Sequence, residues 1–304
     1  MKRPLHIAAT ARFLLALLAL PGMAGTARAA CDVVYPLTLD SRYDYDWEVL
    51  RTALEKTAPN NLPCTVHASE AAMEESRANG ELAAAGGRIN VFSRSTTLTL
   101  EQQFLPVRIP VDKGLLGYRL FLVRSADLPR FAGVRTLQDL RALRAGQGSN
   151  WADVAILRSA GIPVVEGSSY DGLFNMLMAR RFDYFSRAVD EALREIEEHH
   201  ASQPQMALEP GLLLYYPLPR YFFVRRDAEG RRLAQRIGAG LEIMIRDGTL
   251  DQLFQRYKGK SIEQADLPHR RVIRIDNPGL PPETPLSRGE LWYNPLKSAP
   301  LAPH

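Results

Sequence analysis

Polar side chains recur at three points between residues 146 and 187, each where a short apolar run ends. Guanidinium groups bind carboxylates and phosphates, aromatic rings stack on ligands, and hydroxyl and amide groups donate and accept hydrogen bonds. Such side chains suit the binding of a small polar molecule. The three groups are Ser149, Asn150 and Trp151, then Ser168, Ser169 and Tyr170, and finally Ser186 and Arg187.

The pattern around these groups predicts the elements that position them. Short apolar runs alternate with helically spaced apolar residues, which predicts strand, helix, strand, helix and strand over residues 146–187. We expect one helix to start at Asn150 and a second to be capped by Gly167, Ser168 and Ser169. In parallel α/β sheets, ligands bind beyond the carboxyl ends of the strands, beside helix N-termini. The three groups are therefore expected to line one edge of a sheet.

The first 29 residues are typical of a secretory signal peptide. Basic residues at Lys2, Arg3 and Arg12 precede an apolar run over 13–20, and Ala27 and Ala29 form an A-x-A cleavage pattern. The apolar run is too short to span a bilayer. Cleavage after Ala29 predicts a periplasmic protein.

The charge balance argues against nucleic acid as a partner. Four of the 38 basic residues lie in the signal peptide, so the mature chain carries as many basic groups as its 34 acidic ones. A formally neutral chain lacks the excess of positive charge that phosphate backbones attract.

Cys31 and Cys64 are the two cysteines of the chain, and both enter an oxidising compartment, where pairing is expected. Each stands just before an apolar, strand-like run, at residues 33–35 and 65–67. If those strands are parallel neighbours, both sulfurs lie at the same sheet edge. We therefore predict a structural disulfide.

The mature length of about 275 residues indicates two domains. Long strands at 114–124 and 220–225 indicate that one domain is inserted into the other, with two crossing segments. The tail carries eight prolines between Pro268 and Pro303, which excludes a long helix there. A second set of alternating strands and helices precedes residue 100, with a helix expected over residues 69–79. Its strand ends supply four more candidate ligand contacts, which are Tyr35, Arg94, Ser95 and Thr96. Further along, the apolar stripe of Leu233, Ile237, Leu241 and Ile245 predicts a helix over residues 228–246.

Several segments together resemble the periplasmic solute-binding proteins of ABC transporters, specifically family 3, the polar amino-acid type. They are the crossing strand GYRLFLVRSADL, the following TLQDLRAL, the turn GQGSNW, the pattern GSSYDGLFNMLMARRFDYF and the closing YFFVRRDAEGRRLAQRIGAGLEIMIRDGTLDQLFQRY. The resemblance covers most of the mature chain, and it rests on the order and spacing of all these segments.

This resemblance implies a type II periplasmic binding protein fold, in which two α/β lobes close on a small polar ligand. Carried onto this sequence, lobe 1 comprises residues 31–117 and 223–304, and lobe 2 comprises residues 118–222. It also implies a monomeric binding protein without a cofactor, which delivers its ligand to a membrane permease.

Two departures from the family pattern bear on the ligand. Family members often clamp a ligand carboxylate with an Arg where this chain has Gln102 and Gln103, and hold a ligand amine with an Asp where it has Arg187. A cation in place of that acid favours an anionic ligand, or one that lacks the amine. Arg94 and Arg187, one from each lobe, would then meet on one carboxylate or phosphate.

Two other functions stay open at this point. A sensory input protein that reports ligand occupancy to a membrane kinase or cyclase is one. A periplasmic dehydratase of the same fold is the other, with Glu166 or Asp171 as candidate acid or base. We expect no enzyme, because the sequence has no nucleophile elbow, phosphate loop or paired-His motif. No metal site is expected either, since His199 and His200 have no further His or Cys at ligand spacing.

Overall fold

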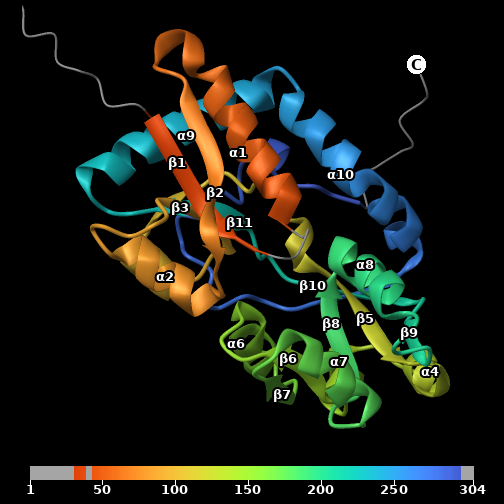
Figure 1. Cartoon of the computed structure of the whole chain (residues 1–304). Helices are drawn as coiled ribbons and strands as arrows, with labels where there is room; N and C mark the ends of the chain where they lie inside the picture. Colours follow the sequence, from red (N-terminus) through yellow and green to blue (C-terminus); the bar gives the residue numbers. More distant parts are fainter. Residues whose placement is uncertain (1–30, 39–42, 296–304) are drawn as a thin grey trace, which may run out of the picture. The chain divides into compact units, whose positions relative to one another are not determined.

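The computed structural model describes residues 31–38 and 43–295 (Figure 1). The predicted signal peptide and the last nine residues lie outside the described residues. The chain from Cys31 onward forms one compact unit. Within the described ranges, no helix combines the length and the apolar character that a membrane crossing requires.

The first two strands form a parallel pair that carries the disulfide. β1 (Cys31–Leu37) and β2 (Cys64–Ala72) pair in register, with Cys31 directly opposite Cys64. The two Cα atoms lie 4.4 Å apart, and the sulfurs are bonded. The predicted disulfide and its origin in parallel neighbouring strands are confirmed.

A three-stranded antiparallel sheet completes the first lobe, by which we mean the part of the molecule built on β1 to β4 and β11. Its strands, in order, are β3 (Val91–Ser95), β11 (Arg220–Val224) and β4 (Leu105–Val107). Helix α1 (Asp44–Lys56) packs on α9 (Ala228–Arg246) and α10 (Thr249–Ala265). Gly240 permits the close approach of α9, because a Cβ there would lie 2.0 Å from the backbone oxygen of Ala53. Two short helices complete the lobe, α2 (Glu75–Ala83) and α3 (Leu98–Gln103).

The second lobe is built on a seven-stranded sheet. Its main path runs β12-β10-β5-β8-β6-β7, and β9 pairs with β5. Strand β6 is parallel to both β7 and β8, so the carboxyl ends of these strands share one edge, as predicted. The strands are β5 (Tyr118–Arg124), β6 (Ala145–Gly148), β7 (Val164–Gly167), β8 (Tyr184–Ala188), β9 (Met206–Leu208), β10 (Leu212–Tyr215) and β12 (Arg271–Arg274). The helices of this lobe are α4 (Leu128–Ala132), α5 (Leu137–Arg141), α6 (Ala152–Ser159), α7 (Tyr170–Met178) and α8 (Val189–His199).

Two helix starts differ from the sequence predictions. Helix α6 begins at Ala152, and Asn150 does not cap it but adopts a left-handed φ of 70°, which Asn tolerates better than most residues. Helix α2 begins at Glu75 rather than at residue 69, because β2 continues through that stretch beside β1. The predicted cap of α7 is confirmed, since the Ser169 side chain accepts a backbone N–H of the first turn.

The tail after α10 departs from the predicted assignment to the first lobe. Strand β12 pairs in parallel with β10, so it extends the second-lobe sheet and covers an edge that would otherwise be unpaired. The tail then reaches the crossing between β4 and β5, where the Trp292 ring lies against Gly114. A Cβ on Gly114 would lie 2.5 Å from that ring, and its φ is 73°, so only glycine suits this position.

Candidate functional site

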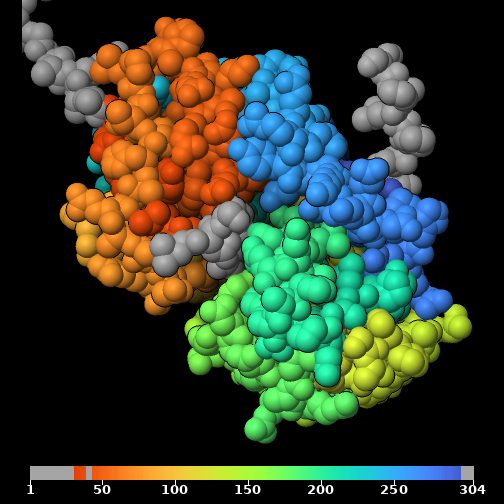
Figure 2. All heavy atoms as spheres, turned by 45° about the vertical axis from the view of Figure 1, so that its right-hand side comes forward, coloured from red at the N-terminus to blue at the C-terminus, as the bar shows by residue number. Residues whose placement is uncertain are grey.

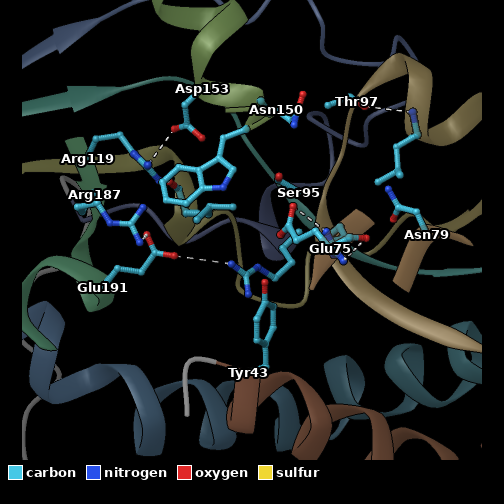
Figure 3. Close-up of a pocket in the computed structure, with 16 residues that line it drawn as sticks. Tyr43, Glu75, Asn79, Ser95, Thr97, Arg119, Asn150, Asp153, Arg187 and Glu191 are labelled. Carbon is cyan, nitrogen blue, oxygen red and sulfur yellow. Dashed lines mark hydrogen bonds and ion pairs between the residues drawn. The ribbon is translucent and has the colours of Figure 1, made fainter. Parts of the chain in front are cut away.

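A cavity of about 160 Å³ receives side chains from both lobes (Figure 3). The first lobe contributes the end of β3, residues of α2, α3 and β11, and the residue before α1. The second lobe contributes β5, β8, the loop after β6 and the first turns of α6 and α8. Its lining is Tyr43, Glu75, Asn79, Arg94, Ser95, Thr97, Leu100, Leu116, Arg119, Asn150, Trp151, Ala152, Asp153, Arg187, Glu191 and Arg220.

The end of β3 forms the first-lobe wall. Arg94 is the second-to-last residue of β3, and its side chain is 13% exposed. Its guanidinium pairs with the Glu75 carboxylate of α2 at 2.8 Å. Ser95 follows it, and Thr97 caps α3 through the backbone N–H of Leu100 at 3.1 Å. This cap and this ion pair hold a hydroxyl and a guanidinium group at the cavity edge.

A buried ion pair anchors the second-lobe wall. Arg119 of β5 is 1% exposed, and its guanidinium lies 2.8 Å from the Asp153 carboxylate in the first turn of α6. Asp153 also accepts a hydrogen bond from the Tyr216 hydroxyl. Burial acts against the charge of Arg119, but the Asp153 carboxylate prevails and raises its pKa. This pair fixes the start of α6, and hence Trp151 and Asn150, against the sheet.

Arg187, at the end of β8, is held by two carboxylates of α8. Its Nε and Nη2 atoms donate to Glu195 at 2.7–3.0 Å, and Nη2 lies 3.1 Å from Glu191. The guanidinium carbon also lies 4.8 Å from the centre of the Trp151 ring. Burial alone would lower the pKa of Arg187, yet Glu191 and Glu195 together raise it. Arg187 therefore lines the cavity with its charge already balanced by carboxylates of α8.

Arg220 of β11 completes the ring of guanidinium groups. It faces Ser95 in the sheet register, and its Nη1 donates to Asp46 at 3.0 Å. Its Nη2 lies 3.9 Å from Glu191 across the lobes, and its guanidinium lies 5.1 Å from the Tyr43 ring centre. Burial opposes its charge, but Asp46 raises its pKa. Its Nε is buried and has no hydrogen-bond partner among the described residues.

Five of the eleven predicted ligand residues line the cavity, and six do not. The five are Arg94, Ser95, Asn150, Trp151 and Arg187. Four of the six make hydrogen bonds elsewhere: buried Thr96 donates to Glu101 at 2.6 Å, Ser149 donates to the Gly167 carbonyl at 3.3 Å, Tyr170 donates to Glu195 at 2.7 Å, and Ser169 caps α7. The ring of Tyr35 stacks on that of Trp47, with 4.3 Å between the ring centres. Ser168 is absent from the lining. Contact with a ligand stays a prediction for each of them.

Sequence reasoning missed several residues of the lining. Glu191 follows Arg187 by four residues, where β8 passes directly into α8, so its closeness in the chain was a signal present in the sequence. Arg220 and Arg119 had no such signal, because only the pairing of β11 with β3 and of β5 with β8 brings them to the site. Among the described residues, no three or more His, Cys, Asp or Glu side chains are placed so that they could hold a metal ion.

This chain matches known proteins in its structure but not in its sequence. No protein-family model matches the chain, and no curated protein sequence does. Solved structures do match. An ancestral arginine-binding protein bound to glutamine has a TM-score of 0.55 at 17% identity, covering 76% of this chain and 99% of that chain. An amino acid ABC transporter substrate-binding protein from Streptococcus pneumoniae, bound to L-arginine, has a TM-score of 0.54 at 14% identity, covering 76% and 93%.

A third similar structure comes from a signalling protein. A histidine kinase sensor domain with similarity to periplasmic binding proteins has a TM-score of 0.53 at 16% identity, covering 76% of this chain and 97% of that chain. At these identities the likeness establishes the fold. The predicted α/β, two-lobed periplasmic binding protein fold is thus confirmed, and amino acid ABC transporter substrate-binding proteins are among its structural neighbours.

Proposed function

We propose that this chain is a periplasmic solute-binding protein, which captures a small polar, anionic or amino-acid-like ligand between its lobes for an ABC transporter. The observation that carries the proposal is the cavity itself, lined from both lobes by hydrogen-bonding and ionic side chains. The transporter part of the proposal is supported by structural neighbours that are substrate-binding proteins of amino acid ABC transporters. We expect it to act as a monomer and without a cofactor.

The mechanism is a population shift between open and closed lobes. Helix α8 of the second lobe presents two consecutive acids to the first lobe. Asp190 accepts from Lys258 of α10 at 2.5 Å, and Glu191 lies 3.9 Å from Arg220. Figure 2 shows the blue-green surface of α8 against the blue surface of α10. A ligand that bridges the lobes adds its own contacts to these pairs and favours the closed form.

The ionic arrangement favours binding over catalysis. Each carboxylate of the lining lies within 4 Å of an arginine: Glu75 of Arg94, Asp153 of Arg119, and Glu191 of Arg187. A general acid or base needs a proton affinity close to the working pH, and a carboxylate committed to a guanidinium is a poor candidate. Glu166, one of the two carboxylates that the sequence offered for catalysis, pairs with Arg158 at 2.7 Å and is not part of the lining.

Ligand binding is tested by thermal unfolding in the presence of single amino acids, keto acids and small dicarboxylates. A ligand at a hundred times its Kd raises the stability by about 2.7 kcal/mol. Arg94→Gln, at the cavity, is expected to weaken any binding found by about tenfold. Arg88→Gln is the matched control, because Arg88 also pairs with a helix acid, Glu81 at 2.8 Å, but lies outside the lining. Equal effects of the two variants would contradict the cavity as the site.

The second candidate function is a ligand-sensing input for a membrane signalling protein, which the sensor-domain neighbour favours. Pull-down of the ligand-bound chain from solubilised membranes separates the two functions. Recovery of a permease supports transport, and recovery of a kinase or cyclase instead supports sensing.

A further inference from the structure

The tail after α10, residues 266–295, contacts both lobes. It leaves the first lobe at the end of α10, and its strand β12 then pairs with β10 along the edge of the second-lobe sheet. Further on, Arg288 donates two hydrogen bonds to Glu242 of α9, at 2.6 and 3.1 Å. The ring of Tyr293 lies 5.6 Å from that of Phe254 in α10, measured between the ring centres. Because α9 and α10 belong to the first lobe, the tail runs from the first lobe to the second and back.

The tail also contacts both segments that connect the lobes, which are residues 108–117 between β4 and β5 and residues 216–219 between β10 and β11. The side-chain amide of Asn277 donates to a carbonyl of the second segment at 2.9 Å. The backbone N–H of Tyr293 donates to the carbonyl of Lys113, in the first segment, at 2.7 Å. An opening of the lobes bends these two segments, so it must also displace the tail that is bonded to them.

The part of the tail between its two anchors, residues 276–287, has little slack. It holds four prolines, each of which fixes one backbone angle: Pro278, Pro281, Pro282 and Pro285. Backbone hydrogen bonds close it into successive turns, from the N–H of Leu280 to the Asn277 carbonyl at 3.1 Å, of Thr284 to Pro281 at 3.0 Å and of Arg288 to Pro285 at 3.2 Å. Extending this stretch would break those turns. A rotation of one lobe away from the other therefore acts directly on the anchors.

These tail contacts coexist with direct contact between the lobes. Asp190 of the second lobe accepts a hydrogen bond from Lys258 of the first at 2.5 Å, and their side chains are only 19% and 11% exposed. This ion pair persists only while α8 and α10 stay in contact. The lobes thus touch in the same conformation in which the tail is docked at both ends, and their separation costs both sets of contacts.

We propose that the tail is a strap, which holds the two lobes near this separation when no ligand is bound. Opening of the cleft then requires the first-lobe end of the strap to detach at Arg288, Trp292 and Tyr293. This inference goes beyond the proposed function, because it concerns the lobes before a ligand arrives. Where the proposed function holds as well, the strap favours binding, since a more populated binding-competent state gives a tighter apparent Kd.

The experiment measures the distance between the lobes in the ligand-free mature chain. Nitroxide labels are attached to Ser76→Cys and Ala155→Cys, two exposed positions on α2 and α6, helices that line the cavity from opposite lobes (Figure 1). The native disulfide is retained. Pulsed electron paramagnetic resonance then gives the distribution of distances between the two labels. The labelled chain with its strap intact is expected to show mainly one short distance.

Two variants release the strap in different ways. Arg288→Gln with Trp292→Ala removes the two hydrogen bonds to α9 and the ring that lies against the first connecting segment. Four glycines inserted between Leu286 and Ser287, both exposed, lengthen the strap and keep every side chain of its anchors. Each variant is expected to raise the ratio of long to short distances by about tenfold, which corresponds to about 1.4 kcal/mol. The insertion decides the question if the double substitution prevents folding.

Each variant has a matched control. Arg256→Gln breaks another arginine–glutamate pair, with Glu48 at 3.4 Å, but that pair lies within the first lobe. The same four glycines inserted between the exposed residues Ala201 and Ser202 lengthen a loop of the second lobe that is not part of the strap. Both controls are expected to keep the distances of the intact chain.

Unchanged distances in the strap variants overturn the inference, as does an equal change in the controls. A thermal stability that falls while the distances stay unchanged overturns it too, because the tail then acts as ordinary packing. Where the thermal screen has supplied a ligand, its Kd is expected to weaken about tenfold in the strap variants, in step with the distances. A screen that finds no ligand contradicts the proposed function alone, because the distances are measured without one.

Discussion

Asp112 is a buried acid in the crossing between β4 and β5, and its removal should change how stability depends on pH. It is 7% exposed, and its two carboxylate oxygens accept the backbone N–H groups of Gly114 at 3.1 Å and Leu116 at 2.9 Å. Burial raises its pKa from 3.8 to about 6, against the opposing effects of Arg220 and of these hydrogen bonds.

The sign and size of the effect follow from this pKa. The folded protein holds the Asp112 proton more tightly than the unfolded chain does, so protonation favours folding. That contribution is fully present below a pH of about 4 and is lost as the pH rises through about 6. A pKa raised from 3.8 to about 6 corresponds to about 3 kcal/mol between these limits.

The measurement is urea unfolding of wild type and Asp112→Asn at several pH values between about 4 and 7.5. Because other groups titrate in both proteins, the difference between the two free energies of unfolding isolates Asp112. The amide keeps one acceptor and loses the other, which adds a cost of about 1–2 kcal/mol that does not depend on pH. The variant is expected to gain about 3 kcal/mol relative to the wild type as the pH rises across this window.

A control variant makes the test specific. The pKa of Asp139 is lowered, by hydrogen bonds from the backbone of Arg135 first and from Thr136, so it titrates below the window. Asp139→Asn should therefore differ from the wild type by a constant amount above a pH of about 5. If the difference for Asp112→Asn is also constant from about 4 to 7.5, the reasoning from burial is refuted.

Two further predictions concern stability. Replacing Cys31 and Cys64 together by serine removes a cross-link between residues 33 apart and should lower the free energy of unfolding by about 3–4 kcal/mol. Reduction of the wild-type disulfide should give the same loss when unfolding is measured in urea. An unchanged free energy of unfolding after reduction would contradict the disulfide. Leu291→Ala, at a tail residue that is 1% exposed, should cost about 3 kcal/mol in thermal unfolding, whereas Leu286→Ala, 54% exposed, should cost almost nothing. Equal stability of these two variants would show that the tail does not pack in solution as described.

Local patterns predicted much of the fold. The alternation of strands and helices over residues 146–187 is confirmed in β6, α6, β7, α7 and β8, because each element carries its own periodicity and turn residues. The long helix α9 was predicted at its observed bounds, Ala228–Arg246, from its apolar stripe. The cysteine pair could be predicted for a different reason, because each cysteine precedes a strand-like run and the two strands are parallel neighbours.

Contacts between distant segments account for what the sequence could not predict. Strand β12 joins the second lobe because β10 offers an edge, and nothing local to residues 271–274 indicates that partner. Tyr35 was expected to contact the ligand because it stands at the predicted end of a strand, yet its ring stacks on Trp47 of α1. Trp151 and Arg187 were both expected at the site, but their contact with each other depends on the pairing of β6 with β8, which brings the loop after β6 beside the end of β8.

The sequence by itself determined where the elements lie and which strand ends carry polar groups, because these depend on nearest neighbours in the chain. It also predicted the cysteine pair, because the chain has only two cysteines and both enter an oxidising compartment. The tertiary structure alone decided the electrostatics of the site. The sequence shows Arg187 as a cation in place of an acid, and only the folded chain places Glu195 behind it, Glu191 beside it and Arg220 opposite. Charge interactions act through space and strengthen with burial, so the sign of a site depends on every group that folding brings within a few ångströms.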